Sequence, residues 1–180
     1  HQACYERVLQ RDRVPAHARV ARWLESLPGE RAQEQIADHY ERGDEAARAL
    51  PAWQRAAQQA QARYANEQAL AHATRALALA PAADLPRRYE LTLLRSQVFA
   101  LTGQAAARAA ELDALEQLAA TLGDAQRRCQ ALEARAASHV DAGAAETALQ
   151  VARQAQALAP TQSPQVAARA GRLAVFALRM

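Results

Sequence analysis

The 180-residue sequence contains no lysine, so the positive side of its net charge of +3 comes from 22 arginines. Without lysine the chain has no residue for a P-loop, a Schiff base or a serine–lysine pair. It also has no apolar run near the 18 residues or so that a transmembrane helix needs, and its start lacks the apolar core of a signal peptide. These absences exclude ATP hydrolysis by this segment and argue against membrane insertion.

Cysteine is scarce as well. The only two, Cys4 and Cys129, lie far apart in the sequence and form no spacing signature. Such a pair is typical of free thiols in a reducing compartment rather than of a disulfide framework or a zinc site. We therefore expect a cytoplasmic protein with no metal and no cofactor.

Bulky apolar residues are rare: the sequence has one isoleucine, one methionine and two phenylalanines, against 50 alanines. Alanine is the strongest helix former, and β-branched residues are few, so the composition predicts an all-α fold. Because an alanine buries little area, stability has to come from the close approach of many helices.

Helical periodicity and its interruptions predict about ten helices, including ones at residues 2–10, 15–27 and 165–179. Pro15 is expected in the first turn of its helix, and Pro51 at the start or at a kink of another. Gly43 is expected to end a helix as a left-handed cap, with Asp44 capping the next. The last three helix junctions before the C-terminal region, at Gly103, Gly123 and Gly143, stand twenty residues apart. This spacing is typical of an α-solenoid of helix pairs.

Two segments repeat each other: "ALAHATRALALAP" at residues 69–81 and "ALQVARQAQALAP" at 148–160, identical at eight of thirteen positions. Together with the residues before them, they resemble the tetratricopeptide (TPR) family, whose helix pairs have one bulky position, three small positions and a closing proline. The matching residues are Trp53, Ala57, Ala69, Ala76 and Pro81 in one copy, and Leu132, Ala136, Ala148, Ala155 and Pro160 in the other. This resemblance implies a right-handed α-solenoid of antiparallel helix pairs. The small positions would be those where helix backbones approach most closely.

Between these copies lies a longer, weaker repeat with Ser96 and Phe99 at family positions but Arg108 where a small residue is usual. Units of about forty residues resemble the TPR arrays of bacterial signalling ATPases of the STAND class, which include ATP-dependent transcriptional regulators and adenylate-cyclase-linked ATPases. The N-terminal segment resembles the junction that follows their ATPase and winged-helix modules. It matches at Tyr5-Glu6, Leu9, Arg11-Asp12-Arg13, His17, Val20-Ala21, Leu24-Glu25, His39-Tyr40 and Gly43-Asp44. We therefore expect a helical junction at residues 1–28 after an upstream module, and TPR-like repeats at 29–180, cut from a longer chain.

The resemblance also indicates a binding surface, because the first helix of each TPR pair lines the inner groove of the array. The candidate groove residues are Gln54, Gln58, Gln61, Glu90, Gln97, Gln130 and Glu133. This lining lacks the lysine, arginine and asparagine residues that some TPR domains use to hold a C-terminal carboxylate. A domain that binds the C-terminal tails of chaperones is therefore not expected. We expect instead a protein partner or a small inducer, coupled to the upstream ATPase of the same chain. Simple solvation of these polar positions is the alternative.

Other functions are less well supported by the residues. The cluster Asp38, His39, Glu41, Asp44 and Glu45 has no second histidine near it in the sequence and is interpreted as a capped helix end rather than a metal site. No nucleophile, base and acid form a catalytic pattern, so no enzymatic activity is expected in this segment. A structural scaffold for self-association is the main alternative. A DNA-contacting domain that uses Arg7, Arg11, Arg13, Arg19 and Arg22 is less favoured, because acidic residues are interspersed.

Overall fold

The structure is a computed structural model that describes residues 10–27 and 33–158. In these residues the chain forms eight α-helices and no strand, which confirms the predicted all-α class. The helices are α2 (Gln10–Ser26), α3 (Gln33–Arg42), α4 (Ala46–Ala62), α5 (Asn66–Leu79), α6 (Leu85–Leu101), α7 (Ala105–Leu122), α8 (Ala125–Asp141) and α9 (Ala145–Leu158). The helices expected at 2–10 and 165–179 fall, except for Gln10, outside the described residues, as do Cys4 and Pro160.

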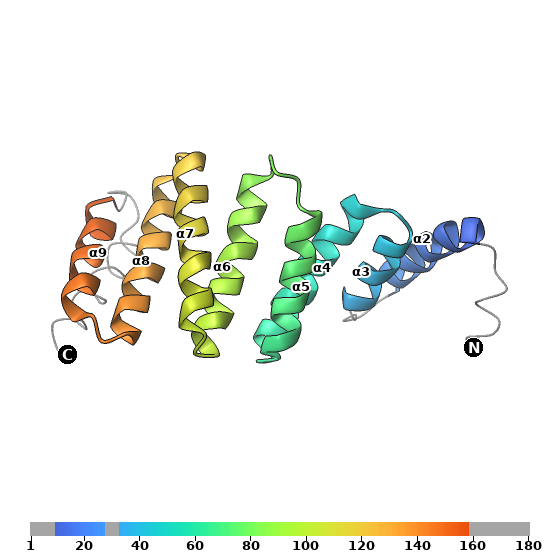
Figure 1. Ribbon diagram of the computed structural model, residues 1–180. Helices are drawn as coiled ribbons and strands as arrows, with labels where there is room; N and C mark the ends of the chain where they lie inside the picture. Colours follow the sequence, from blue (N-terminus) through green and yellow to red (C-terminus); the bar gives the residue numbers. More distant parts are fainter. Residues whose placement is uncertain (1–9, 28–32, 159–180) are drawn as a thin grey trace. The chain divides into compact units, whose positions relative to one another are not determined.

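The chain divides into two compact units, residues 1–81 and 82–180. In the first unit α2 packs on α3, α3 on α4, and α4 on α5. In the second unit α6 packs on α7, α7 on α8, and α8 on α9. Each unit is thus a series of helical hairpins in which neighbours in sequence are neighbours in space (Figure 1).

Most helix junctions use the same tight turn, in which one left-handed residue is followed by a single residue before the next helix. The left-handed residues are Asp44, Tyr64, Gly103, Gly123 and Gly143. At Tyr64, for example, the following amide of Ala65 donates back to the carbonyl of Ala60 at 2.9 Å, and Tyr64 donates to Gln61 at 3.0 Å. This pair of bonds is the Schellman motif, which satisfies carbonyls at the end of a helix. The glycines predicted at the later junctions, Gly103, Gly123 and Gly143, therefore occupy left-handed positions, which glycine adopts without strain.

Both prolines lie inside helices, Pro15 in α2 rather than in a first turn and Pro51 in α4 rather than at a helix start. α4 begins at Ala46, so the two helices expected around Pro51 are one. A proline inside a helix removes one hydrogen bond and crowds one carbonyl. The helix-forming residues on both sides, and the burial of Leu50, Ala52 and Trp53 beside Pro51, outweigh that local defect.

The junction between α3 and α4 corrects two further predictions. Gly43 is not left-handed; Asp44 is, with φ of 57°, and Glu45 is the N-terminal cap residue of α4. Gly43 is needed for a different reason, because a Cβ there would lie 2.8 Å from the backbone nitrogen of Ala18 on α2. Real Cβ contacts are not that short, so this glycine lets α2 lie directly against the end of α3.

The core is built mainly from small residues with a few large ones between them. In the first unit Ile36 and Tyr40 of α3 are at most 1% exposed. In the second unit Tyr89, Leu112 and Leu115 form one buried cluster. All six repeat-motif alanines expected at close helix contacts are fully buried: Ala57, Ala69, Ala76, Ala136, Ala148 and Ala155. Helix packing at these positions leaves no room for a larger side chain.

Candidate functional site

Three of the predicted groove residues lie on α4 in the first unit. Gln54, Gln58 and Gln61 are spaced by four and three residues, so they share one face of that helix. Gln58 is exposed, whereas Gln54 and Gln61 are half-buried. α4 therefore carries a short polar face beside its buried alanine and tryptophan side.

The other four predicted groove residues lie in the second unit, Glu90 and Gln97 on α6 and Gln130 and Glu133 on α8. The structure brings α6 and α8 together through Tyr89, whose hydroxyl contacts the Gln130 side chain at 3.1 Å and donates to the Arg127 carbonyl at 2.9 Å. Burial raises the pKa of Tyr89 far above its ordinary value, so the phenol stays neutral. Gln130 is thereby fixed in place, while Glu90 and Gln97 are exposed.

The bulky residue of the first repeat copy, Trp53, is held by polar contacts as well as by burial. Its indole nitrogen donates to Glu41 at 2.9 Å, and Arg75 of α5 contacts the same carboxylate at 2.8 Å. Burial acts to raise the pKa of Glu41, but the hydrogen bonds from Arg75 and Trp53 outweigh it and leave the pKa below its ordinary value. The imidazole of His72 stacks on the indole with ring centroids 5.2 Å apart. These contacts join α3, α4 and α5.

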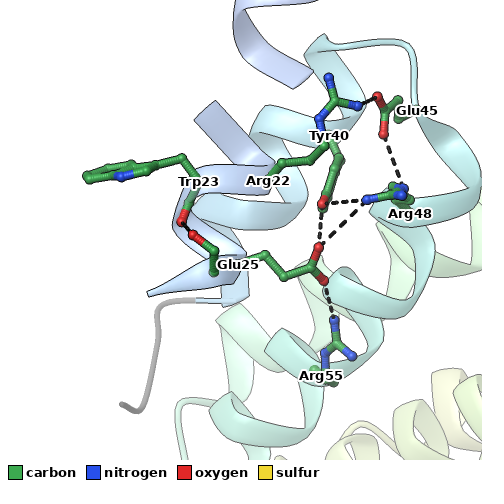
Figure 2. Close-up of polar contacts among 8 residues, drawn as sticks. Arg22, Trp23, Glu25, Tyr40, Glu45, Arg48 and Arg55 are labelled. Carbon is green, nitrogen blue, oxygen red and sulfur yellow. Dashed lines mark hydrogen bonds and ion pairs between the residues drawn. The ribbon is translucent and has the colours of Figure 1, made fainter. Parts of the chain in front are cut away.

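A second polar network joins α2 to α3 and α4 (Figure 2). Glu25 of α2 accepts a hydrogen bond from Tyr40 of α3, whose pKa is raised by burial and by that carboxylate. Glu25 also lies 3.9 Å from Arg48 and 3.8 Å from Arg55, both on α4. Sequence reasoning missed this network, because its members are far apart in the chain.

The same region holds a further ion pair, between Arg22 of α2 and Glu45 at the start of α4, at 2.6 Å. The nearby indole of Trp23 points away from the other labelled residues and is 60% exposed (Figure 2). Of the arginines considered for DNA contact, Arg22 is thus ion-paired, and Arg19 donates to the carbonyl of Pro15 at 3.3 Å. Arg7 lies outside the described residues.

No second histidine is expected near His39 from the sequence, and the structure shows that this prediction is wrong. His17 of α2 faces it, with the two Nδ1 atoms 2.8 Å apart and the ring centroids 5.0 Å apart. Burial lowers the pKa of His17, and the neighbouring His39 and Arg42 lower it further, against the opposing effect of Asp38. No group of three or more metal-ligating side chains occurs within residues 10–27 and 33–158.

A cleft of about 320 Å³ lies between α7 and α8. Its apolar lining consists of alanines and Leu132, and its polar lining is Glu116, Gln117 and Arg128. Glu116 is held by Arg135 at 2.7 Å. The volume is at the lower end of the range for small-molecule sites. The sequence does not predict this cleft, because the alanines in its wall have the same pattern as alanines in any packed helix.

Cys129, one of the two cysteines expected to be free, is a buried free thiol. It contacts the carbonyl of Ala155 at 3.1 Å. Burial, followed by the nearby Glu133 carboxylate, raises the pKa of the thiol to about 11. A thiol that stays protonated at neutral pH is a poor nucleophile and a poor metal ligand, so Cys129 serves as core packing.

Comparisons with protein-family models, with curated proteins and with solved structures found no match. The described helices include none that is long and apolar enough to span a membrane.

Proposed function

We propose that this chain is a TPR-like regulatory binding segment of a STAND-class signalling ATPase, a right-handed solenoid of helix pairs with no catalysis of its own. The observation that carries the proposal is the complete burial of the six small positions of the two repeat copies, together with 7% exposure of Trp53. Small residues at these positions are what the resemblance requires.

The departure at Arg108 is compatible with the proposal. Arg108 is only 9% exposed, and its guanidinium reaches Asp141 at the end of α8 at 2.5 Å. A long side chain can occupy a tight helix contact when its aliphatic part is buried and its charged end reaches a partner near the surface. The middle repeat therefore differs in side chain without losing its packing between α7 and α8.

In this proposal the ligand binds to the first helices of the pairs, α4, α6 and α8. The candidate groove residues on these helices are glutamines and glutamates, which offer hydrogen-bond acceptors and negative charge. A partner segment rich in amides or basic groups fits such a lining. Binding would shift the parent protein between autoinhibited and open arrangements, provided that the ligand prefers one of them. α2 would transmit the shift, because it is tied to α3 and α4 by the network of Figure 2.

A test is binding of a panel of peptides and small metabolites, followed by comparison of matched glutamine-to-arginine variants. Gln58→Arg and Gln97→Arg alter the candidate groove, whereas Gln68→Arg and Gln150→Arg alter equally exposed glutamines on α5 and α9. We expect the groove variants to weaken a bound ligand at least about tenfold, equal to ~1.4 kcal/mol, and the controls to leave its Kd unchanged. A ligand that all four variants bind as tightly as the wild type contradicts the groove assignment.

The cleft between α7 and α8 favours the small-inducer form of the proposal. Its volume of about 320 Å³ suits a small molecule rather than a peptide. Ala120→Phe would fill it from an exposed position in its wall. If the ligand is a small molecule in this cleft, Ala120→Phe abolishes binding and Gln97→Arg does not.

Self-association is the second candidate function, and the exposed apolar residues of α2 favour it. Trp23 is 60% exposed, and Val14 and Val20 are 40% and 37% exposed. An exposed tryptophan on a helix is a common anchor of protein interfaces. Light scattering that shows a dimer in the wild type and a monomer in Trp23→Ser would support a scaffold. Association that disappears when a capping helix pair is appended to the chain would instead be an effect of an uncapped repeat array.

A further inference from the structure

The contact between His17 and His39 is sensitive to protonation by its geometry. Two imidazole nitrogens 2.8 Å apart form a hydrogen bond only when one Nδ1 carries a proton and the other does not. If both rings are fully protonated, both nitrogens are donors, the bond is lost, and two positive charges face each other at contact distance. The docked pair can therefore accept one proton fewer than two separated histidines.

This pair lies within the contact between α2 and α3. One residue along α2, Ala18 is 4% exposed and packs on Gly43 so closely that no Cβ fits between them. Ala21, one turn further, is fully buried. Because the backbones are this close, docking of α2 on α3 holds the Cα atoms of both histidines within reach of a ring-to-ring contact.

The charged groups around the pair do not compensate for a second proton. On α3, Arg42 opposes protonation of His17 and Asp38 favours it, but these two residues pair with each other at 2.9 Å. On α2, Arg13 stands four residues before His17 and offers no negative charge to the pair. From the start of α4, the Glu45 carboxylate is already engaged by Arg22 and Arg48.

The other polar contacts of α2 depend on groups that titrate in a different pH range. Glu25 and Glu45 hold Tyr40, Arg22, Arg48 and Arg55 through carboxylates. Carboxylates ordinarily titrate near pH 4, whereas histidine titrates near pH 6.5. As the pH falls below neutral, the histidine pair is thus the part of this contact whose hydrogen bonding changes first.

We propose that the His17–His39 pair is a proton-sensitive clasp, which holds α2 against α3 at neutral pH and weakens that hold in mild acid. Separation of the two rings allows one additional proton to bind. The docking equilibrium therefore shifts toward the undocked state by about tenfold for each pH unit below about 6.5. If α2 transmits the regulatory signal, the clasp makes that transmission pH-dependent. Only this consequence rests on the proposed function, since the clasp itself is a property of α2 and α3.

The experiment is hydrogen exchange of the α2 backbone amides at pH 7.5, 6.5 and 5.5, corrected for the intrinsic dependence of exchange on pH. We expect protection of α2 to fall about tenfold from pH 6.5 to 5.5 in the wild type, while protection of α7 and α8 is unchanged. In His39→Asn the fall should disappear, because the amide can donate to a neutral His17 and accept from a protonated one. His17→Asn is the reciprocal variant and should behave in the same way.

Two controls fix the interpretation. His139→Asn removes a histidine on α8, in the other unit, and should leave the α2 response unchanged. Gly43→Ala forces α2 away from α3 by a steric clash and should lower α2 protection at every pH, which shows that the readout detects undocking. The clasp is overturned if wild-type α2 protection is the same at pH 7.5 and 5.5. It is also overturned if the two asparagine variants, folded by circular dichroism, keep the wild-type loss. Neither result depends on whether the groove binds a ligand.

Discussion

The two repeat copies offer a matched test of close packing, because each has one buried and one exposed alanine two residues apart. On α5 these are Ala76, fully buried, and Ala78, exposed; on α9 they are Ala155 and Ala157. Replacement by leucine adds three carbons at the same point of the same helix, with nearly the same helix propensity. Only the space around the side chain differs within each pair.

At the buried positions the added carbons have to displace a neighbouring helix. Overpacking of a well-filled core costs about 1–3 kcal/mol, so Ala76→Leu and Ala155→Leu should lower the free energy of unfolding by that amount. At the exposed positions the change should stay within about 0.5 kcal/mol. With a urea m-value of about 2 kcal/mol/M, the buried variants lower the unfolding midpoint by roughly 0.5–1.5 M.

The assay is urea unfolding, followed by Trp53 fluorescence for the α5 pair and by circular dichroism for the α9 pair. Equal effects of leucine at buried and exposed positions, in either helix, would refute the reasoning. Such a result would mean that the alanines reflect composition and not helix contact, and the register on which the proposed groove depends would be lost.

Three further predictions concern other parts of the molecule. Tyr64 has a φ of 58°, so Tyr64→Gly should relieve left-handed strain and raise the free energy of unfolding by up to about 1 kcal/mol. Gly103 has a φ of 69°, so Gly103→Ala should lower the free energy of unfolding by about 1–2 kcal/mol. Urea unfolding measures both changes. Arg95 and Glu111 form a largely buried ion pair at 2.7 Å, with the Arg95 Nε unpartnered and the pKa of Glu111 raised by burial against the pull of Arg95. Glu111→Gln should therefore lower the free energy of unfolding by about 2–3 kcal/mol, because it leaves the Arg95 charge buried without its partner. The double change Arg95→Met and Glu111→Leu should lower it little or not at all. A double variant as unstable as the single one would contradict this prediction. Burial lowers the pKa of His72 although Glu34 acts to raise it, so the folded state binds this proton less tightly than the unfolded chain. The stability contributed by neutral His72 is full above about pH 6.5 and is lost as the pH falls below it, and urea midpoints at pH 7.5 and 5.5 should differ less in His72→Gln than in the wild type.

The parts of the fold that follow from local backbone rules could be predicted from the sequence. Gly103, Gly123 and Gly143 mark left-handed turns because glycine adopts that conformation without strain, and Pro81 ends α5 because it holds Ala80 extended. Pro15 is not in the first turn of its helix and Pro51 does not start one, because the helix-forming residues around them outweigh a local defect. Gly43 was misread, since its role is set by the approach of α2.

The candidate site was predictable only where one helix carries it. Gln54, Gln58 and Gln61 follow from helical spacing along α4. The His17–His39 contact could not be predicted, because it joins residues 22 positions apart across a turn whose path the sequence does not reveal. The cleft between α7 and α8 depends on which alanines face a neighbour and which face solvent, and the composition is the same in both cases.

The solenoid proposal requires the two units to move as one body, because only then can α4, α6 and α8 line one surface. ¹⁵N NMR relaxation measures this directly as a rotational correlation time for each helix. A single solenoid predicts the same correlation time for α4 and α5 as for α6 to α9. Two distinct and shorter times, one for each unit, would contradict a continuous groove.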